Sequence, residues 1–108
     1  MLPKSRRLIE KRDFDRVFGE GRTFQFPAVR VAVATGQGRY GIVASKAFGC
    51  VARRNTIRRR WREALGQLAA ELPLNLDAVF VVKAAAGSLR GDAVREALRG
   101  ALAAIEKS

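Results

Sequence analysis

The sequence has 108 residues, 48% of them hydrophobic, which is enough for a single folded domain with its own core. Its formal net charge is +11, and its one cysteine excludes an internal disulfide. The start of the chain lacks the apolar run of a signal peptide, and no stretch is long and apolar enough for a transmembrane helix. We therefore expect residues 1–108 to form one cytoplasmic domain that does not contact membranes.

The positive charge is concentrated in the first part of the chain. Residues 1–62 contain 16 Lys or Arg and 4 Asp or Glu, whereas residues 63–108 contain 5 and 6, so the balances are +12 and −1. A polyanion is the natural partner of such a surface, because each neutralised phosphate releases condensed counterions. The alternative is a charged surface that serves solubility alone, but solubility does not require this asymmetry.

The first predicted element is a short helix over about residues 11–19, where Phe14, Val17 and Phe18 recur at helical spacing before two glycines. Aromatic side chains at this spacing usually belong to a core. Beside basic residues, however, they also form a stacking platform for unpaired nucleotides. Both interpretations stay open for Phe14 and Phe18.

Two strands are predicted next. Residues 28–35 alternate valine with other residues, which is typical of a strand. A turn is predicted at residues 36–39, and residues 40–47 then predict a return strand. We expect the two strands to pair as a hairpin.

The following predicted helix, over about residues 52–72, is rich in arginine. An apolar stripe along it is expected to face the core and consists of Ile57, Trp61, Ala64, Leu65, Leu68 and Leu72. Proline at position 73 ends the helix. The stripe leaves the opposite side of the helix free for a partner.

That opposite side is cationic: six arginines occupy the ten positions from Arg53 to Arg62. Asn55, Arg59 and Arg62 lie opposite the stripe, with Arg58 and Arg60 at its flanks. Guanidinium groups match phosphate oxygens, and an amide side chain suits a sugar hydroxyl or a base edge. The alternative is a solvated charged face, but such faces usually mix charges of both signs.

The last two predicted elements are a strand and a helix. Residues 77–84 are almost continuously apolar, as in a strand covered on both sides. Residues 92–107 predict a helix whose inward side chains are Val94, Leu98, Ala101, Leu102 and Ile105. The order α-β-β-α-β-α predicts an α/β (α+β) two-layer sandwich with a small mixed sheet. If the strands that flank the basic helix are parallel neighbours, general rules favour a right-handed crossover.

Several kinds of site are missing from the sequence. There is no histidine, which removes the usual general base at neutral pH and the commonest metal ligand. Cys50 has no partner for redox or metal chemistry, so we expect it to be a small packed side chain. We therefore predict no metal site and no catalytic acid–base set in the protein itself.

Two segments resemble the bacterial ribonuclease P protein subunit. "KAFGCVARRNTIRRRWREA", from Lys46 to Ala64, is similar to the family signature, in which a Lys and a Gly precede a basic helix centred on Arg-Asn. "RLIEKRDFDRVFGEGRT", residues 7–23, resembles the N-terminal helix of the family and its basic lead-in. Asp77 at the start of an apolar strand and the final amphipathic helix extend the resemblance over essentially the whole chain.

The resemblance implies a left-handed β-α-β crossover that carries the arginine helix. It also implies the function: the protein binds ribonuclease P RNA, and together they remove the 5′ leader from precursor transfer RNA. In this family the RNA carries the catalysis and, with the substrate, holds most of the Mg²⁺. The implied particle is a 1:1 complex of a monomeric protein with the RNA.

Carried over by position, the resemblance assigns two groups of residues. The RNA-binding group comprises Lys46, Arg53, Arg54, Asn55, Arg58, Arg59 and Arg62. The leader-binding group comprises Arg12, Phe14 and Phe18, together with the sheet face. The sequence departs from the family pattern at Ala47, Cys50 and Thr56, where basic residues are common, and the additional charge at Arg53 and Arg60 compensates.

Two other functions are considered. A ribosomal or other structured-RNA-binding protein without a catalytic partner would share the basic helix, but it would give no reason for a leader-binding cleft. A small autonomous nuclease would need an acid–base set that the sequence lacks. Reconstitution with ribonuclease P RNA separates the three.

Overall fold

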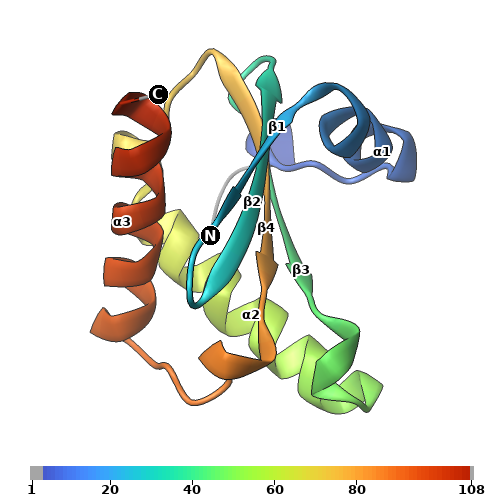
Figure 1. Ribbon diagram of the computed structural model, residues 1–108, viewed down its shortest axis with the longest axis vertical. Helices are drawn as coiled ribbons and strands as arrows, with labels where there is room; N and C mark the ends of the chain where they lie inside the picture. Colours follow the sequence, from blue (N-terminus) through green and yellow to red (C-terminus); the bar gives the residue numbers. More distant parts are fainter. Residues whose placement is uncertain (1–3, 108) are drawn as a thin grey trace.

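The structure is a computed structural model that describes residues 4–107. Its helices and strands are α1 (Lys11–Glu20), β1 (Arg22–Gln25), β2 (Val29–Thr35), β3 (Tyr40–Ala44), α2 (Val51–Gln67), β4 (Leu76–Val82) and α3 (Asp92–Lys107) (Figure 1). Short 3₁₀ turns also occur at η1 (Lys4–Arg6), η2 (Lys46–Phe48), η3 (Ala69–Glu71) and η4 (Ala84–Ala86). The α/β class, the mixed sheet and the approximate places of the three helices are confirmed.

The sheet order differs from the predicted one. Its strands are joined in the order β1-β2-β4-β3, and β4 is antiparallel to β2 and parallel to β3. The hairpin predicted between residues 28–35 and 40–47 is therefore wrong, because β4 lies between the two strands. In this central place the apolar run of β4 is covered on both faces, and Val79 and Phe80 are both 0% exposed.

The sequence pattern also misses β1, so the observed order is α-β-β-β-α-β-α. This edge strand has four residues, of which only Phe24 is partly buried. A short, mostly exposed strand lacks the alternation of apolar residues by which a strand is predicted from sequence. Here β1 forms by pairing with β2, with Phe24 opposite Val31.

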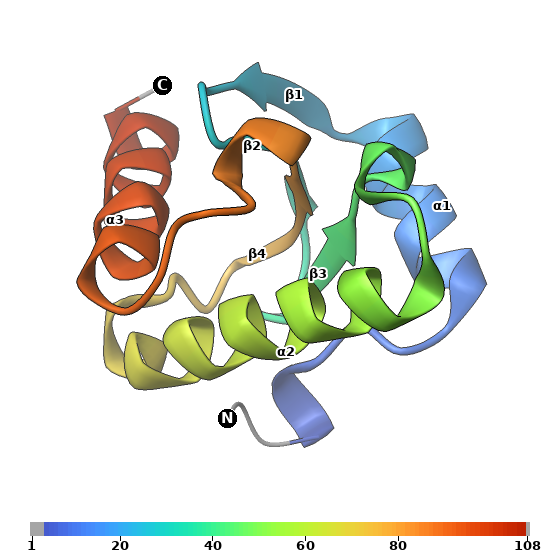
Figure 2. The same ribbon diagram turned by 90° about the horizontal axis from the view of Figure 1, so that it is seen from below.

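A β-α-β crossover connects the parallel strands β3 and β4 through α2. In Figure 1 both strands run downward, β3 lies behind β4, and the chain returns through α2 on the side of α3; Figure 2 shows the same arrangement from below. Followed in this way, the crossover is left-handed. The family resemblance implies this hand, and the general rule for such units disfavours it.

Helices cover both faces of the sheet. On one face α2 and α3 pack against Val29, Val31, Phe80 and Val82 to form the larger core. On the other face α1 packs with Val17 against Ala32, Ala34 and Val79. In Figure 1 α1 lies beside only the upper part of its face, so the lower part of that face has no helix over it.

The predicted inward side chains of both long helices are buried. The α2 stripe from Ile57 to Leu72 is at most 5% exposed at every predicted position, and the α3 stripe from Val94 to Ile105 is at most 6% exposed. The predicted end of α2 is wrong, because the α-helix stops at Gln67. Leu68 then donates its N–H to the Leu65 carbonyl at 3.1 Å, and the chain continues as a 3₁₀ turn that still buries Leu72.

The prediction for Cys50 is also wrong, because its side chain is exposed. It lies directly before α2, at the N-cap position. A residue there precedes the helical stripe, so the periodicity that buries Ile57 does not apply to it.

Candidate nucleic-acid interface

The predicted row of basic residues on α2 exists as a surface. Arg54, Arg58 and Arg62 are four residues apart, so they follow one another along the helix. Arg54 and Arg58 are partly buried beside the stripe, whereas Arg62 is exposed. Asn55 and Arg59 are exposed next to this row. We call these five residues the α2 row.

No carboxylate neutralises the α2 row within the described residues. The ion pairs found there involve Arg12, Arg16, Arg39, Arg95 and Arg99. Arg58 instead donates to the Asn55 side-chain oxygen, and the buried Nε of Arg54 has no hydrogen-bond partner. Clustered guanidinium groups without counter-charges are suited to an anionic ligand that supplies several phosphates.

The remaining two arginines of the helix lie on its other side, toward α3. Arg60 donates to the carbonyl oxygens of Gly87 and Leu89, both at 3.2 Å, so it anchors the connection between β4 and α3. Arg53 lies over the Phe48 ring, with 5.7 Å from its guanidinium carbon to the ring centroid. The structure therefore separates Arg53 from the other predicted RNA-binding residues on α2. Arg60 was expected to replace charge that the sequence lacks at positions where the family is commonly basic. Its guanidinium is instead bound to two carbonyl oxygens.

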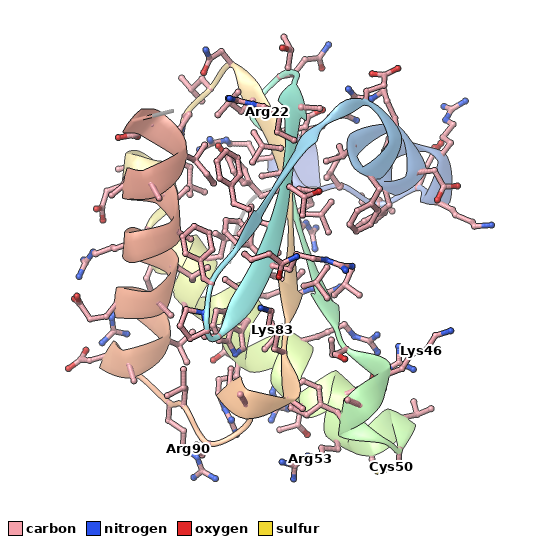
Figure 3. All side chains as sticks on the ribbon, in the orientation of Figure 1. Arg22, Lys46, Cys50, Arg53, Lys83 and Arg90 are labelled. Atoms are coloured by element: carbon pink, nitrogen blue, oxygen red, sulfur yellow. The ribbon has the colours of Figure 1, made fainter. Side chains whose placement is uncertain are left out.

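Lys46 is the first residue of η2, which follows the end of β3. Its side chain is exposed, and Ser45 fixes the turn by accepting the N–H of Ala47 at 3.2 Å. Figure 3 shows Lys46 projecting toward the side of the sheet on which α1 lies, whereas Arg53 projects from the lower end of the molecule. Lys46 thus lies nearer than Arg53 to the uncovered part of the sheet face.

The predicted leader-binding residues lie on α1. Phe14 is partly buried and its ring packs against Gly41, where an added Cβ would approach the ring to 2.7 Å. Phe18 is 40% exposed. Arg12 is exposed and pairs with Glu10 at 2.6 Å. The two interpretations of the aromatic pair therefore divide: Phe14 is largely a packing residue, and Phe18 presents a free ring surface.

A buried carboxylate that the sequence pattern did not single out for this role holds α1 in place. Asp77 on β4 is 0% exposed and pairs with Arg16 of α1. Its other oxygen accepts the backbone N–H groups of Gln37 and Arg39, both at 3.0 Å. Burial by itself would raise the pKa of Asp77, but these N–H donors and the Arg16 guanidinium hold the pKa below its ordinary value.

Two further residues near α2 were not predicted. Arg7 and Ile9, in the segment before α1, line a cavity together with Arg62. No periodicity marks them, because they belong to no helix or strand. Only the adjacent basic and apolar residues at the start of the resembling segment 7–23 could have drawn attention to them.

Comparison with known proteins decides the family. The family model described as Ribonuclease P matches residues 2–106. The chain belongs to the ribonuclease P protein family. The ribonuclease P protein component of Herpetosiphon aurantiacus is 31% identical over 100 residues, which are 90% of this chain and 81% of that protein. That of Chloroflexus aurantiacus is 37% identical over 85 residues, which are 76% of this chain and 63% of that protein.

A solved ribonuclease P protein supports the same assignment. The protein from Thermotoga maritima superposes with a TM-score of 0.78 at 29% identity, and the match covers 89% of this chain and 96% of that one. The α+β fold is therefore that of ribonuclease P proteins.

Two properties of the described residues bear on the remaining predictions. No described helix is both long enough and apolar enough to cross a membrane. Within residues 4–107, no group of three or more Asp, Glu, Cys or His side chains is placed to bind a metal ion. Two acids at the contact between α1 and the sheet, Asp13 and Asp77, are paired with arginines.

Proposed function

We propose that this chain is the protein component of a ribonuclease P ribonucleoprotein, which cleaves the 5′ leader from precursor transfer RNA. Membership of the family supports the proposal. The structural observation that carries it is the α2 row, where arginines without carboxylate partners project from a helix whose other side is buried. Such a row attracts phosphates while the core fixes its position.

In this proposal the α2 row binds the catalytic RNA. Arg54, Arg58 and Arg62 follow one line along the helix, and this line can track one RNA backbone. Asn55 adds a donor and an acceptor for a ribose hydroxyl or a base edge. Lys46 extends the cationic surface toward the uncovered part of the sheet, as its exposed side chain in η2 allows.

The leader of the precursor would lie along α1 and the adjacent sheet face. The exposed ring of Phe18 offers a stacking surface, and Arg12 supplies a nearby cation. The buried contacts of Asp77 with Arg16 and with the loop after β2 keep α1 at a fixed place on the sheet. The protein therefore serves to position the leader relative to the catalytic RNA.

We assign the chemical step to the RNA partner. The described residues offer no cluster of metal ligands, and the carboxylates of Asp13 and Asp77 are paired with arginines. Any Mg²⁺ would then be bound by RNA and substrate phosphates, where it would activate water and stabilise the leaving oxygen. The protein contributes charge neutralisation and positioning.

We further propose one protein monomer for each ribonuclease P RNA, in a cytoplasmic particle. A single α2 row on each chain suits one docking site on the RNA. Sedimentation of the protein mixed with the RNA would measure this ratio. Two proteins bound per RNA at saturation would contradict it.

Reconstitution tests the function directly. Purified protein and bacterial ribonuclease P RNA should process precursor transfer RNA at low Mg²⁺, where the RNA alone is slow. The expected gain is in rate or in affinity for the precursor, because the protein screens phosphate repulsion between the two RNAs. If the protein produces neither gain, the proposal fails. Activity of carefully RNA-free protein would show instead that it is an autonomous nuclease.

A non-catalytic ribosomal or other structured-RNA-binding protein is the alternative function. The family assignment does not favour it. It would bind structured RNA through the α2 row equally well, but it would not distinguish precursor from mature transfer RNA. Equal affinity for the two in the reconstituted complex would support this alternative.

A further inference from the structure

A cavity of about 280 Å³ lies where the segment before α1 meets α1, β3 and α2. Figure 2 shows this segment passing between α2 and α1, at the β3 edge of the sheet. The cavity shares Arg62 with the α2 row and Phe14 with the predicted leader-binding group. It therefore lies between the two surfaces to which the proposed function assigns different RNAs.

The walls of the cavity are apolar and its polar lining is cationic. Phe14, Leu65 and Ile9 supply the apolar surface, and Ile9 is 58% exposed although it lies in a cavity wall. Arg7 and Arg62 are its charged lining residues, and none of the described residues that line it is acidic. Neither arginine has an ion pair among the described residues, and the buried Nε of Arg7 has no hydrogen-bond partner.

The free edge of β3 adds backbone groups to this lining. The Arg39 carbonyl accepts from Ala78, and the Ser45 N–H donates to Val82, so odd-numbered residues of β3 bond to β4. Even-numbered residues therefore face the other way. The Tyr40 carbonyl accepts the Leu8 N–H at 3.0 Å. The N–H and C=O of Ile42, which lines the cavity, have no partner among the described residues.

These features together match one nucleotide. A flat apolar wall with an aromatic ring accommodates a base, and a neighbouring N–H and C=O can pair with a base edge. Two guanidinium groups are suited to the phosphate. The cavity volume of about 280 Å³ lies just below the range of about 300–1,000 Å³ that is usual for small-molecule sites, which suits a single base.

We propose that this cavity binds an unpaired nucleotide of the RNA that lies along the α2 row. The inference rests on the proposed function and adds a site to it. The base enters beside Phe14, Ile42 pairs with the base edge, and Arg7 and Arg62 hold the phosphate. We commit to the ribonuclease P RNA as the source, because Arg62 continues the row assigned to that RNA.

An extended acidic peptide added to the β3 edge is the competing occupant. Strand addition needs a run of free backbone groups. Here the Leu8 N–H already binds the Tyr40 carbonyl, and η2 begins at Lys46, two residues after the end of β3. Only a short edge around Ile42 is left, which favours a nucleotide.

The first test is a titration of the full chain, labelled for amide NMR, with adenosine 5′-monophosphate. We expect shifts at the amides of Ile9, Gly41 and Ile42 that inorganic phosphate at equal concentration does not produce. Arg7→Gln should reduce the affinity by roughly tenfold, in line with the loss of a charged hydrogen-bonding partner. Arg99→Gln on α3 removes the same charge and should leave the affinity unchanged.

A second variant guards against misfolding of Arg7→Gln. Ile9→Asp changes an exposed side chain and places a negative charge at the cavity, so it should also weaken binding of the nucleotide. Shifts that are equal for phosphate alone, or that are absent at Ile42, would overturn the proposal. Binding of an oligo-aspartate peptide at Ile42 in place of the nucleotide would also overturn it.

The RNA source is tested separately. Arg7→Gln should lower the affinity for ribonuclease P RNA by roughly tenfold and leave the affinity for a leader oligonucleotide unchanged. A loss confined to the leader would refute our assignment of the source. The nucleotide titration needs no RNA enzyme, so its failure leaves the proposed function standing. A failed reconstitution, in turn, leaves the titration interpretable.

Discussion

At the scale of single residues, Asp77 combines a buried charge with contacts to two other segments of the chain. Its carboxylate meets Arg16 of α1 and Arg39 of the loop before β3, and it accepts the backbone N–H groups of that loop. Removing such a carboxylate leaves partly buried guanidinium groups and backbone donors without a partner, which costs more than losing an exposed ion pair. Asp77 therefore links the stability of the fold to the position of α1.

Because the pKa of Asp77 is lowered in the folded state, its contribution depends on pH. The stabilisation is present above the pKa of the unfolded chain, about 4, and is lost as the pH falls through the lower folded pKa. We expect Asp77→Asn to lower the free energy of unfolding by about 3 kcal/mol at neutral pH. The variant should also lose less of its remaining stability than the wild type as the pH falls. Urea unfolding at neutral and acid pH measures both.

Asp13→Asn is the matched control for Asp77→Asn. Asp13 pairs with Arg39 at 3.5 Å and its side chain is 21% exposed, so we expect a loss of about 1 kcal/mol or less. If the two variants lower the free energy of unfolding equally, the buried position of Asp77 adds no stability beyond that of an ordinary ion pair.

Tyr40 gives a second pH-dependent prediction. Burial raises the pKa of Tyr40 to about 12, and its hydroxyl donates to the Pro73 carbonyl at 2.6 Å. The unfolded chain ionises at about pH 10, so stability declines above that pH. Tyr40→Phe should remove this decline and cost about 1 kcal/mol at neutral pH. Since the sequence has 1 tyrosine, absorbance titration of the wild type reports this group alone.

At the scale of elements, α2 combines three tasks on three sides of one helix. Its stripe fills the larger core, the α2 row faces a partner, and Arg60 holds the connection to α3. Removing charge from the row should therefore change binding and leave stability nearly unchanged. Removing Arg60 should change stability first.

We expect Arg58→Ala combined with Arg62→Ala to weaken binding to ribonuclease P RNA and to flatten its salt dependence. The log–log slope should fall by roughly two units, about one for each lost phosphate contact. Arg95→Ala combined with Arg99→Ala removes the same charge from α3, where both arginines pair with acids. If the two double variants change the slope equally, the α2 row has no special role.

At the scale of the whole molecule, the left-handed crossover sets the spacing of two surfaces. It carries α2 from the end of β3 to the face opposite α1, so the α2 row and the exposed ring of Phe18 belong to separate elements. The cavity beside Arg62 and Phe14 lies between them. Two RNAs can thus contact one small protein without competing for the same residues.

This separation predicts that Phe18→Ala affects one RNA only. The affinity for precursors with long leaders should fall about tenfold, as expected for the loss of one base–aromatic stack. Affinity for ribonuclease P RNA should not change. Leu74→Ala removes another exposed apolar side chain, 70% exposed, and should affect neither. Equal losses on leaderless RNA would indicate unfolding of the protein and not lost stacking.

The sequence by itself determined the long elements and the chemistry of the interface. The periodicity of α2 and α3 predicted their buried side chains correctly, because an amphipathic helix of this length has one apolar stripe to bury. The arginines of α2 could be predicted as a candidate polyanion-binding surface, because charge of one sign is visible without coordinates. The family resemblance supplied the hand of the crossover, which periodicity does not encode.

Only the tertiary structure decided what depends on contacts between distant segments. The insertion of β4 between β2 and β3, the pairing of the short β1 and the cavity at the β3 edge all require neighbours that are far apart in sequence. The same holds for the contacts of Arg53 and Arg60, because the Phe48 ring and the carbonyls of Gly87 and Leu89 come from η2 and from the loop before α3. Local sequence reports the preferences of one segment, whereas sheet order and cavity shape are fixed by how several segments bury their apolar surface together.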